Sequence, residues 1–201
     1  MIRSDELEFE LEDEMEYELE YERSGMIPGP LRIQVLYDRS RPGSREFEYE
    51  DEGELFDPAP PPRGAVLLTK FGPSSAALTR EHRRVIIPKL AAAMLRAWPK
   101  DSTFCWSVSI VGHEDEIGNP ANYRGKGMQR AQAVMEELLK QLAALVKRMP
   151  AASRPKGRLI LTVATAGPTR PIRSNVTEAG RAMNRRVEVT ARRPEVCRDL
   201  V

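Results

Sequence analysis

The sequence of 201 residues is poor in the residues that build metal centres and disulfide scaffolds. It has two cysteines and two histidines, which excludes a disulfide-rich scaffold and a four-cysteine zinc site. No apolar run approaches the roughly 20 residues that a transmembrane helix needs. The first residues, Met-Ile-Arg-Ser-Asp-Glu, become acidic at once and lack the apolar stretch of a secretory signal. We therefore expect neither a membrane-spanning helix nor a visible signal peptide.

The spacings that accompany catalysis are also missing. The sequence has no Ser-His-Asp or Cys-His arrangement, no phosphate-binding glycine loop and no zinc-ligand spacing. Glu114, Asp115 and Glu116 are consecutive, so their side chains point in different directions and do not form an acid–base pair. We expect His113 to be a hydrogen-bonded structural residue and His82 a solvated helix residue. The sequence thus predicts a protein that is not an enzyme and has no metal or other cofactor.

Charge is balanced in total but separated along the chain. Residues 1–57 contain 19 acids and 6 bases, a net charge of −13, whereas residues 58–201 contain 11 acids and 25 bases, a net charge of +14. Such separation favours an acidic tail joined to a basic domain that has an anionic partner. The hydrophobic content of 41% is enough for a core, which we place in the second part.

The acidic region contains a repeated pattern. From 6 to 21 acids and apolar residues mostly alternate, and the alternation returns more weakly over 46–56. Period two is typical of a strand, but glutamate disfavours strands and neighbouring glutamates on one face repel. We therefore expect residues 1–57 to be largely disordered, with a short strand near 31–37. A solubilising tail, a docking tag that adds a strand to a partner, and a tail that folds back on the basic domain all remain open.

The second part has the patterns of a mixed domain. A proline-rich linker is expected over 58–63, a domain over 64–192 and a tail over 193–201. Strands are predicted over 65–71, 104–111, 159–164 and 186–191, and helices over 79–98 and 127–149. The prolines at 99 and 150 end these helices, and Thr79 is a candidate N-cap. The order β-α-β-α-β-β, with the helices packed on one sheet, predicts an α+β sandwich.

Several single residues have expected positions in this domain. Val85, Leu90 and Met94 are predicted core contacts of the first helix, and Trp98 and Trp106 are predicted to pack in the core or at its edge. For Cys105, on a strand, and Cys197, in the tail, free thiols are favoured over a bridge, which stays an alternative.

Two stretches carry specific motifs. Residues 112–118 are Gly-His-Glu-Asp-Glu-Ile-Gly, and residues 126–131, at the start of the long helix, are Lys-Gly-Met-Gln-Arg-Ala. Residues 178–188 are Glu-Ala-Gly-Arg-Ala-Met-Asn-Arg-Arg-Val-Glu. In this order and spacing they resemble the patterns G-H-T-D-x-x-G, R-A and E-G-R-A-x-N-R-R-V-E of the OmpA-like C-terminal domain family. The resemblance covers about residues 64–192 and leaves 1–57 without a counterpart.

The resemblance implies non-covalent binding of peptidoglycan through the diaminopimelate residue of its stem peptide. Asp115 matches the family's ammonium-binding aspartate, and Arg130, fifteen residues later, matches its carboxylate-binding arginine. A planar guanidinium suits this role because it can hold a carboxylate with two parallel hydrogen bonds. Arg185 matches the first arginine of N-R-R, which lines the same pocket, and Asn184 matches the asparagine beside it. Asn122 is adjacent to a further position where the family has asparagine.

The chain departs from the family beside this site. Glu114 replaces a threonine and adds a negative charge, Tyr123 stands where asparagine is usual, and Lys126-Gly127 replaces Leu-Ser. Asp115 and Arg130 could alternatively form a structural salt bridge, and Arg185 could be a solvated strand end.

Two further arginines of the second motif have an expected role. Arg181 and Arg186 are assigned to structural ion pairs, with Glu188 as a candidate partner.

The leading interpretation is a bacterial binding module that tethers the N-terminal region, or a protein that this acidic region engages, to the cell wall. The alternative is a structural or cargo component of a secretion or injection machine that uses an OmpA-like scaffold. Nucleic-acid binding is disfavoured because the arginines are dispersed and no aromatic-basic motif occurs. The domain implies a location in the cell envelope, in the periplasm or at the outer membrane. The missing signal leaves cytoplasmic synthesis with non-classical delivery open.

Overall fold

A single mixed sheet organises the molecule. The computed structural model describes residues 31–37, 60–98, 104–115, 123–192 and 195–196. Within these ranges the strand order is β1-β4-β3-β5-β2, and β6 pairs with β3. The strands are β1 (Leu31–Tyr37), β2 (Val66–Leu68), β3 (Phe104–His113), β4 (Gly157–Gly167), β5 (Val187–Ala191) and β6 (Glu195–Val196).

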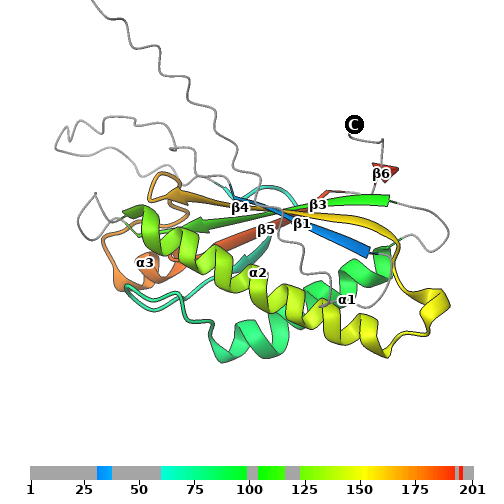
Figure 1. Ribbon diagram of the computed structural model, residues 1–201. Coiled ribbons are helices and arrows are strands. Elements are labelled where there is room, and N and C mark those ends of the chain that lie inside the picture. Colours follow the sequence, from blue (N-terminus) through cyan, green and yellow to red (C-terminus); the bar gives the residue numbers. More distant parts are fainter. Residues whose placement is uncertain (1–30, 38–59, 99–103, 116–122, 193–194, 197–201) are drawn as a thin grey trace, which may run out of the picture.

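The two long helices cover one face of this sheet (Figure 1). They are α1 (Ile87–Ala97), preceded by the π-helical turn η1 (His82–Ile86), and α2 (Tyr123–Arg148). The 3-10 turn η3 (Ala151–Ser153) follows α2, and the short helix α3 (Glu178–Asn184) lies at one end of the sheet. This arrangement confirms the predicted α+β class with helices packed on one sheet.

The pairing in the sheet is mixed. β3 runs parallel to β4 and antiparallel to β5, and β2 is antiparallel to β5. β1 adds a parallel strand to β4, with Leu31 opposite Gly157 and Tyr37 opposite Val163. The strand expected near 31–37 is therefore present, and it joins the sheet although it precedes the expected linker. The predictions for 1–30 and 38–57 concern residues outside the described ranges.

Alternating side chains of the central strands form the core with the inner faces of α1 and α2. Trp106, Val108 and Ile110 of β3 are buried, as are Leu90 and Met94 of α1. The period-two and helical patterns thus predicted the buried faces of the strands and helices. Burial of each such side chain stabilises the folded state by about 1.5–3 kcal/mol. The rings of Trp98 and Trp106 pack with centroids 5.3 Å apart, as expected for core residues. Val85 was wrongly assigned to the core, because 40% of it is exposed.

His82 was wrongly predicted to be solvated. It is buried, and its Nε2 lies 2.8 Å from the carbonyl oxygen of Thr69. The Thr79 hydroxyl accepts from the His82 amide, which confirms the predicted N-cap, while the Thr79 amide donates to His82 Nδ1. Because Nδ1 accepts, Nε2 carries the proton and donates to Thr69. Burial lowers the pKa of His82, which agrees with a neutral ring.

The preference for free thiols was also wrong. Cys105 of β3 is disulfide-bonded. The only other cysteine of the sequence, Cys197, lies outside the described residues. Glu195 of β6 is the register partner of Cys105, so the pairing of β6 with β3 brings the C-terminal segment to this strand.

Candidate functional site

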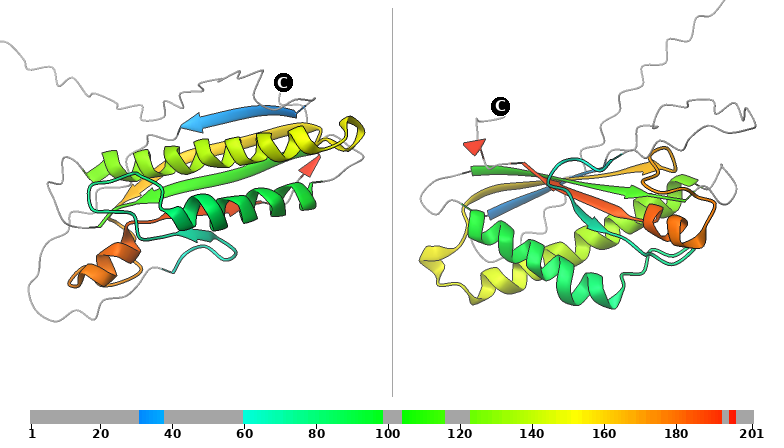
Figure 2. Two further views of the ribbon diagram at one scale, coloured as in Figure 1. Left: turned by 90° about the horizontal axis from the view of Figure 1, so that it is seen from below. Right: turned by 180° about the vertical axis from the view of Figure 1, so that it is seen from behind.

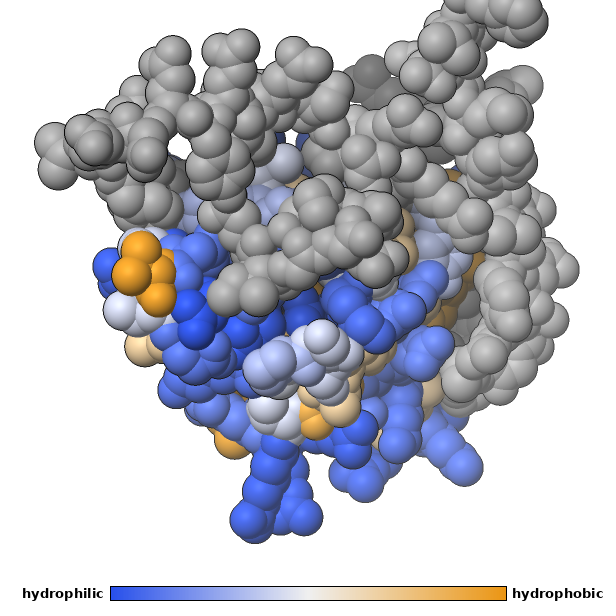
Figure 3. Space-filling view, turned by 90° about the vertical axis from the view of Figure 1, so that its left-hand side faces the viewer, coloured by the Kyte–Doolittle hydropathy of each residue, from blue (hydrophilic) through white to orange (hydrophobic). Residues whose placement is uncertain are grey.

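The residues of both motifs meet at one end of the sheet, where β3 and β4 end, α2 begins and α3 lies (left-hand end in Figure 1). The described surface at this end is mainly hydrophilic (Figure 3). In the described ranges, no group of three or more metal-binding side chains occurs. The side chains that meet here carry carboxylates and guanidinium groups, beside backbone amides and carbonyls.

Arg185 holds two carboxylates at the centre of this end. Its Nη1 donates to Asp115 Oδ2 at 2.6 Å and its Nη2 to Glu178 Oε1 at 2.5 Å, while Nε donates to the Phe71 carbonyl at 2.8 Å. Its side chain is 3% exposed, against 16% for Asp115 and 58% for Glu178. Burial disfavours the charged guanidinium, but the hydrogen bonds to the two carboxylates outweigh this and raise the pKa of Arg185.

Arg130 lies beneath this cluster and is only 1% exposed. Its Nε, Nη1 and Nη2 donate to the carbonyl oxygens of Ser75, His113 and Gly72 at 2.9, 3.0 and 3.3 Å. Burial lowers its pKa, and the negative charges of Asp115 and Glu114 act in the opposite direction. Arg130 is thus electrostatically coupled to Asp115, but the cation in direct contact with Asp115 is Arg185.

Glu114 has its own role at the start of α2. It is buried, and its Oε1 accepts the Gly127 amide at 2.7 Å. Burial raises the pKa of Glu114 to about 7, and the hydrogen bond from Gly127 and the charge of Arg130 limit the rise. The departure from threonine therefore places a buried carboxyl that titrates near neutral pH next to Asp115.

Two glycines allow α2 to approach the end of β3 closely. A Cβ on Gly112 would lie 1.9 Å from the Gly127 carbonyl oxygen, and a Cβ on Gly127 would lie 2.3 Å from Thr165 Oγ1. Neither position accepts a side chain without displacement of the backbone or of Thr165. Gly127, which also departs from the pattern that the motifs resemble, thus permits the contact with Glu114.

A second buried cluster, formed by His113, Arg186 and Glu188, lies next to the site. Arg186 contacts Glu188 at 2.7 Å, and His113 Nε2 lies 3.5 Å from the same carboxylate. Burial lowers the pKa of His113, so the ring is neutral near pH 7 and Arg186 supplies the positive charge. This confirms the structural ion pair expected between Arg186 and Glu188. Arg181 likewise pairs with Glu178 at 3.0 Å.

Asn184 is fully buried at the end of α3 and organises the preceding loop. Its Oδ1 accepts the amides of Ile172 and Arg173, and its Nδ2 donates to the Arg173 carbonyl and to Asn175 Oδ1. These bonds fix the loop and the position of Arg185, the next residue. Asn184 therefore positions the site from within the fold.

The structure brings Asp115, Arg130 and Arg185 together, while Asn122 lies outside the described residues. Glu178 was not predicted as a site residue, although it lies in the second motif, seven residues before Arg185. Sequence analysis also missed the carbonyl groups of Phe71, Gly72 and Ser75, for which no side-chain pattern exists.

No protein-family model matches the chain. A stretch of 84 residues is 38% identical to outer membrane porin F of Pseudomonas fluorescens, and it covers 42% of this chain but only 22% of the porin.

The peptidoglycan-associated lipoprotein of Burkholderia pseudomallei is 21% identical, with a TM-score of 0.44, over 62% of this chain and 88% of the lipoprotein chain. The C-terminal domain of Helicobacter pylori MotB is 21% identical, with a TM-score of 0.46, over 64% of this chain and 85% of that domain. The two motifs of this chain, together with the match to the porin, make its second part similar to the OmpA-like C-terminal domain family.

Proposed function

We propose that this protein binds peptidoglycan without a catalytic step, and that the recognised group is the diaminopimelate of the stem peptide. The observation that carries the proposal is the cluster of Asp115, Arg185 and Arg130 at the end of the sheet. It places Asp115 beside two guanidinium groups, with Asp115 and Arg185 in contact at 2.6 Å, while Glu178 is a second carboxylate on Arg185. A ligand that carries an ammonium and a carboxylate on one carbon complements this pattern of charge.

Asp115 is the proposed acceptor for the ammonium group. A carboxylate has two oxygens and about four acceptor positions. Its Oδ2 accepts from Arg185, which fixes the side chain, and 16% of the Asp115 side chain is exposed. The anion is therefore oriented before the ligand arrives, so that less side-chain entropy is lost on binding.

Arg130 is the proposed donor for the ligand carboxylate. In the structure it donates to the carbonyl groups of Gly72 and Ser75, in a loop where Ser74 has a φ of 50°. Its guanidinium reaches the ligand if the carboxylate replaces one of these carbonyls. A charge-assisted bond then takes the place of a neutral acceptor, which is the stronger interaction. Arg185 lines the same pocket and balances the charge of Asp115.

The disulfide at Cys105 supports a location in the cell envelope, because disulfides persist in oxidising compartments such as the bacterial periplasm. In such a place the domain would tether the N-terminal region, or a protein that binds it, to the cell wall.

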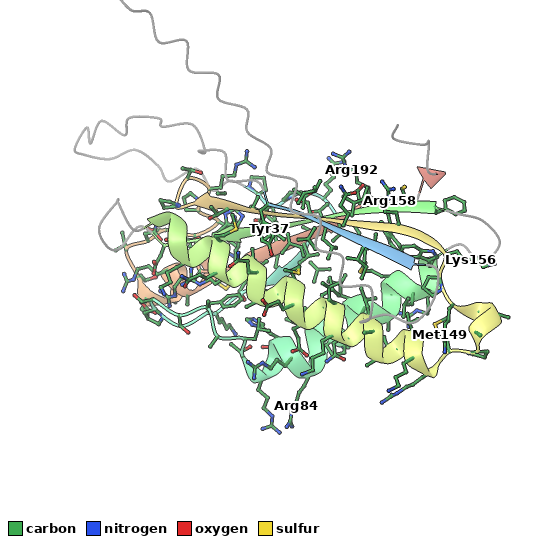
Figure 4. All side chains as sticks on the ribbon, viewed as in Figure 1. Tyr37, Arg84, Met149, Lys156, Arg158 and Arg192 are labelled. Atoms are coloured by element: carbon green, nitrogen blue, oxygen red, sulfur yellow. The ribbon has the colours of Figure 1, made fainter. Side chains whose placement is uncertain are left out.

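Co-sedimentation of the full chain with diaminopimelate-type peptidoglycan tests the proposal. We expect Asp115→Asn and Arg130→Gln each to reduce the bound fraction at least about tenfold, which corresponds to the loss of one charged contact. Arg84→Ala is the matched control, because Arg84 projects from η1 on the helical side of the sheet (Figure 4). Binding by both site variants at the level of the unchanged chain would contradict the assignment.

A further inference from the structure

An apolar groove borders the outer strand of the sheet. It has a volume of about 610 Å³ and lies between β1 and α2. Its lining is mainly apolar, with Ile33, Val35 and Tyr37 from β1 and Met135 and Leu139 from α2. Charged side chains also line it, namely those of Arg83, Glu136, Glu137 and Lys140. Of the strands that the structure describes, only β4 pairs with β1, so β1 is the edge of the sheet on this side (Figure 2). Sheet edges of this kind accept an added strand.

The sequence contains a segment with the length and pattern of such a strand. Residues 15–21 are Met-Glu-Tyr-Glu-Leu-Glu-Tyr, seven residues in strict alternation, and β1 also has seven residues. Alternate side chains of a strand point to opposite faces of a sheet. A strand formed by 15–21 would therefore have one wholly apolar face, with two tyrosines, and one wholly acidic face.

We propose that residues 15–21 of the same chain add an antiparallel strand to the outer edge of β1 and fill this groove with their apolar face. The connection of nine residues, 22–30, includes Gly25 and the turn-forming sequence Pro-Gly-Pro at 28–30, so it can reverse the chain direction. Met15, Tyr17, Leu19 and Tyr21 then lie on the same side of the sheet as the side chains of Ile33 and Val35. Removal of these apolar surfaces from water provides the driving force.

The acidic face of the segment has a matching environment on the other side of the sheet. Glu16, Glu18 and Glu20 would lie on the face opposite the helices, where Arg158 of β4 and Arg192 project (Figure 4). Arg158 is half-buried and Arg192 is exposed. Arg158 lies two strand positions from the added strand and reduces the repulsion between neighbouring glutamates, which is the main obstacle to a strand of this composition, whereas Arg192 follows β5 and lies farther away.

The short connection favours the chain's own segment over other occupants. A flexible tether of this length holds the segment near β1 at an effective concentration of about millimolar. A second copy of the chain or a separate partner strand would have to compete with that concentration.

The docked segment would lie away from the proposed peptidoglycan site. β1 is in register with Gly157 to Val163, whereas β4 continues to Gly167 at the site end. The inference is independent of the proposed function, and it differs from a tail that covers Arg130 and Arg185.

Photo-crosslinking of the full chain tests the docking directly. With p-benzoylphenylalanine in place of Tyr17, we expect intramolecular crosslinks to peptides that contain Ile33 or Met135. The matched control places the same group at Glu18, one residue away on the opposite face, and should not label Met135. Crosslinks from position 17 to residues 112–115 or 170–186, dimeric products, or no product with the groove peptides would each overturn the proposal.

Hydrogen exchange gives a second measurement. The variant Tyr17→Ser/Leu19→Ser/Tyr21→Ser should exchange the β1 amides at least about tenfold faster than the unchanged chain, because the added strand no longer protects this edge. The control Phe47→Ser/Tyr49→Ser alters the second acidic tract in the same way and should leave the β1 amides unchanged. Equal exchange rates in both variants would overturn the docking of 15–21.

Discussion

Asp115 and Arg185 lie 70 positions apart in the chain, and their side chains meet at 2.6 Å at the end of the sheet. Each belongs to a different motif, so the contact joins the two motifs into one site. Arg185 also donates to the Phe71 carbonyl, which ties this pair to the loop that covers Arg130. The site is therefore an ion-pair network in which the Asp115 side chain, two residues after the end of β3, is 16% exposed.

Replacement of Glu114 by glutamine should change stability in a pH-dependent way. The pKa of Glu114 is raised from 4.5 to about 7 in the folded chain, so the folded state binds more protons than the unfolded state between these values. The stability of the unchanged protein should therefore fall as pH rises through about 7. Glutamine can still accept the Gly127 amide, and we expect Glu114→Gln to gain about 1–3 kcal/mol at pH 8 and little at pH 5.

Urea denaturation at the two pH values measures this effect. Glu136→Gln, on the exposed side of α2, is the control and should have equal effects at both. A gain for Glu114→Gln that is the same at pH 5 and pH 8 would show that burial of the charged carboxyl is not its cause.

Truncation of Glu188 should destabilise the domain strongly. Glu188→Ala leaves the guanidinium of Arg186, which is 1% exposed in its side chain, without its carboxylate. We expect a loss of about 3–5 kcal/mol in the free energy of unfolding, because an uncompensated charge remains buried. The control Lys140→Ala removes an exposed lysine that lies 4.0 Å from Glu137 and should cost less than about 1 kcal/mol. Similar losses in both variants would contradict the supporting role of the buried pair.

The close approach of α2 and β3 predicts opposite effects at two glycines of the same helix. In Gly127→Ala the new methyl group would lie 2.3 Å from Thr165 Oγ1, and we expect a loss of about 1–3 kcal/mol. In Gly125→Ala no atom lies within 4 Å of the new group, so the better helix propensity should add about 0.5–1 kcal/mol. Thermal unfolding of both variants measures these changes in stability. A Gly127→Ala variant as stable as the unchanged chain would contradict the close approach of α2 to Thr165.

The disulfide at Cys105 predicts the thiol content of the purified protein. Because Cys197 is the only other cysteine, the unfolded chain without reductant should have no thiol that reacts with an alkylating reagent. Double replacement of both residues by serine should lower the free energy of unfolding by about 2–5 kcal/mol. Alkylation of both cysteines in protein purified from an oxidising compartment would contradict the bridge.

The sequence was sufficient for those parts of the fold that a local pattern encodes. The alternation of Trp106, Val108 and Ile110 predicted the buried face of β3, and the two motifs predicted a common site for Asp115 and Arg185, which are in contact. The pairing of β1 with β4 was beyond prediction, because parallel partners far apart in sequence have no local signal.

The sequence also did not predict which polar side chains are buried. His82 and Arg130 both lie against the segment before η1, and backbone carbonyls of Thr69 and Ser75 satisfy them. Every residue has a carbonyl, so no residue type in the sequence marks these acceptors.

Calorimetric titration of the full chain with a diaminopimelate-containing stem peptide, and with the same peptide that contains lysine in its place, tests the central claim most directly. Lysine keeps the ammonium group but lacks the carboxylate on the same carbon. We predict that the diaminopimelate peptide binds at least about tenfold more tightly, which is the value of one charge-assisted contact. We also predict that Asp115→Asn abolishes binding of both peptides. Equal affinity for the two peptides, or unchanged binding by Asp115→Asn, would contradict the account.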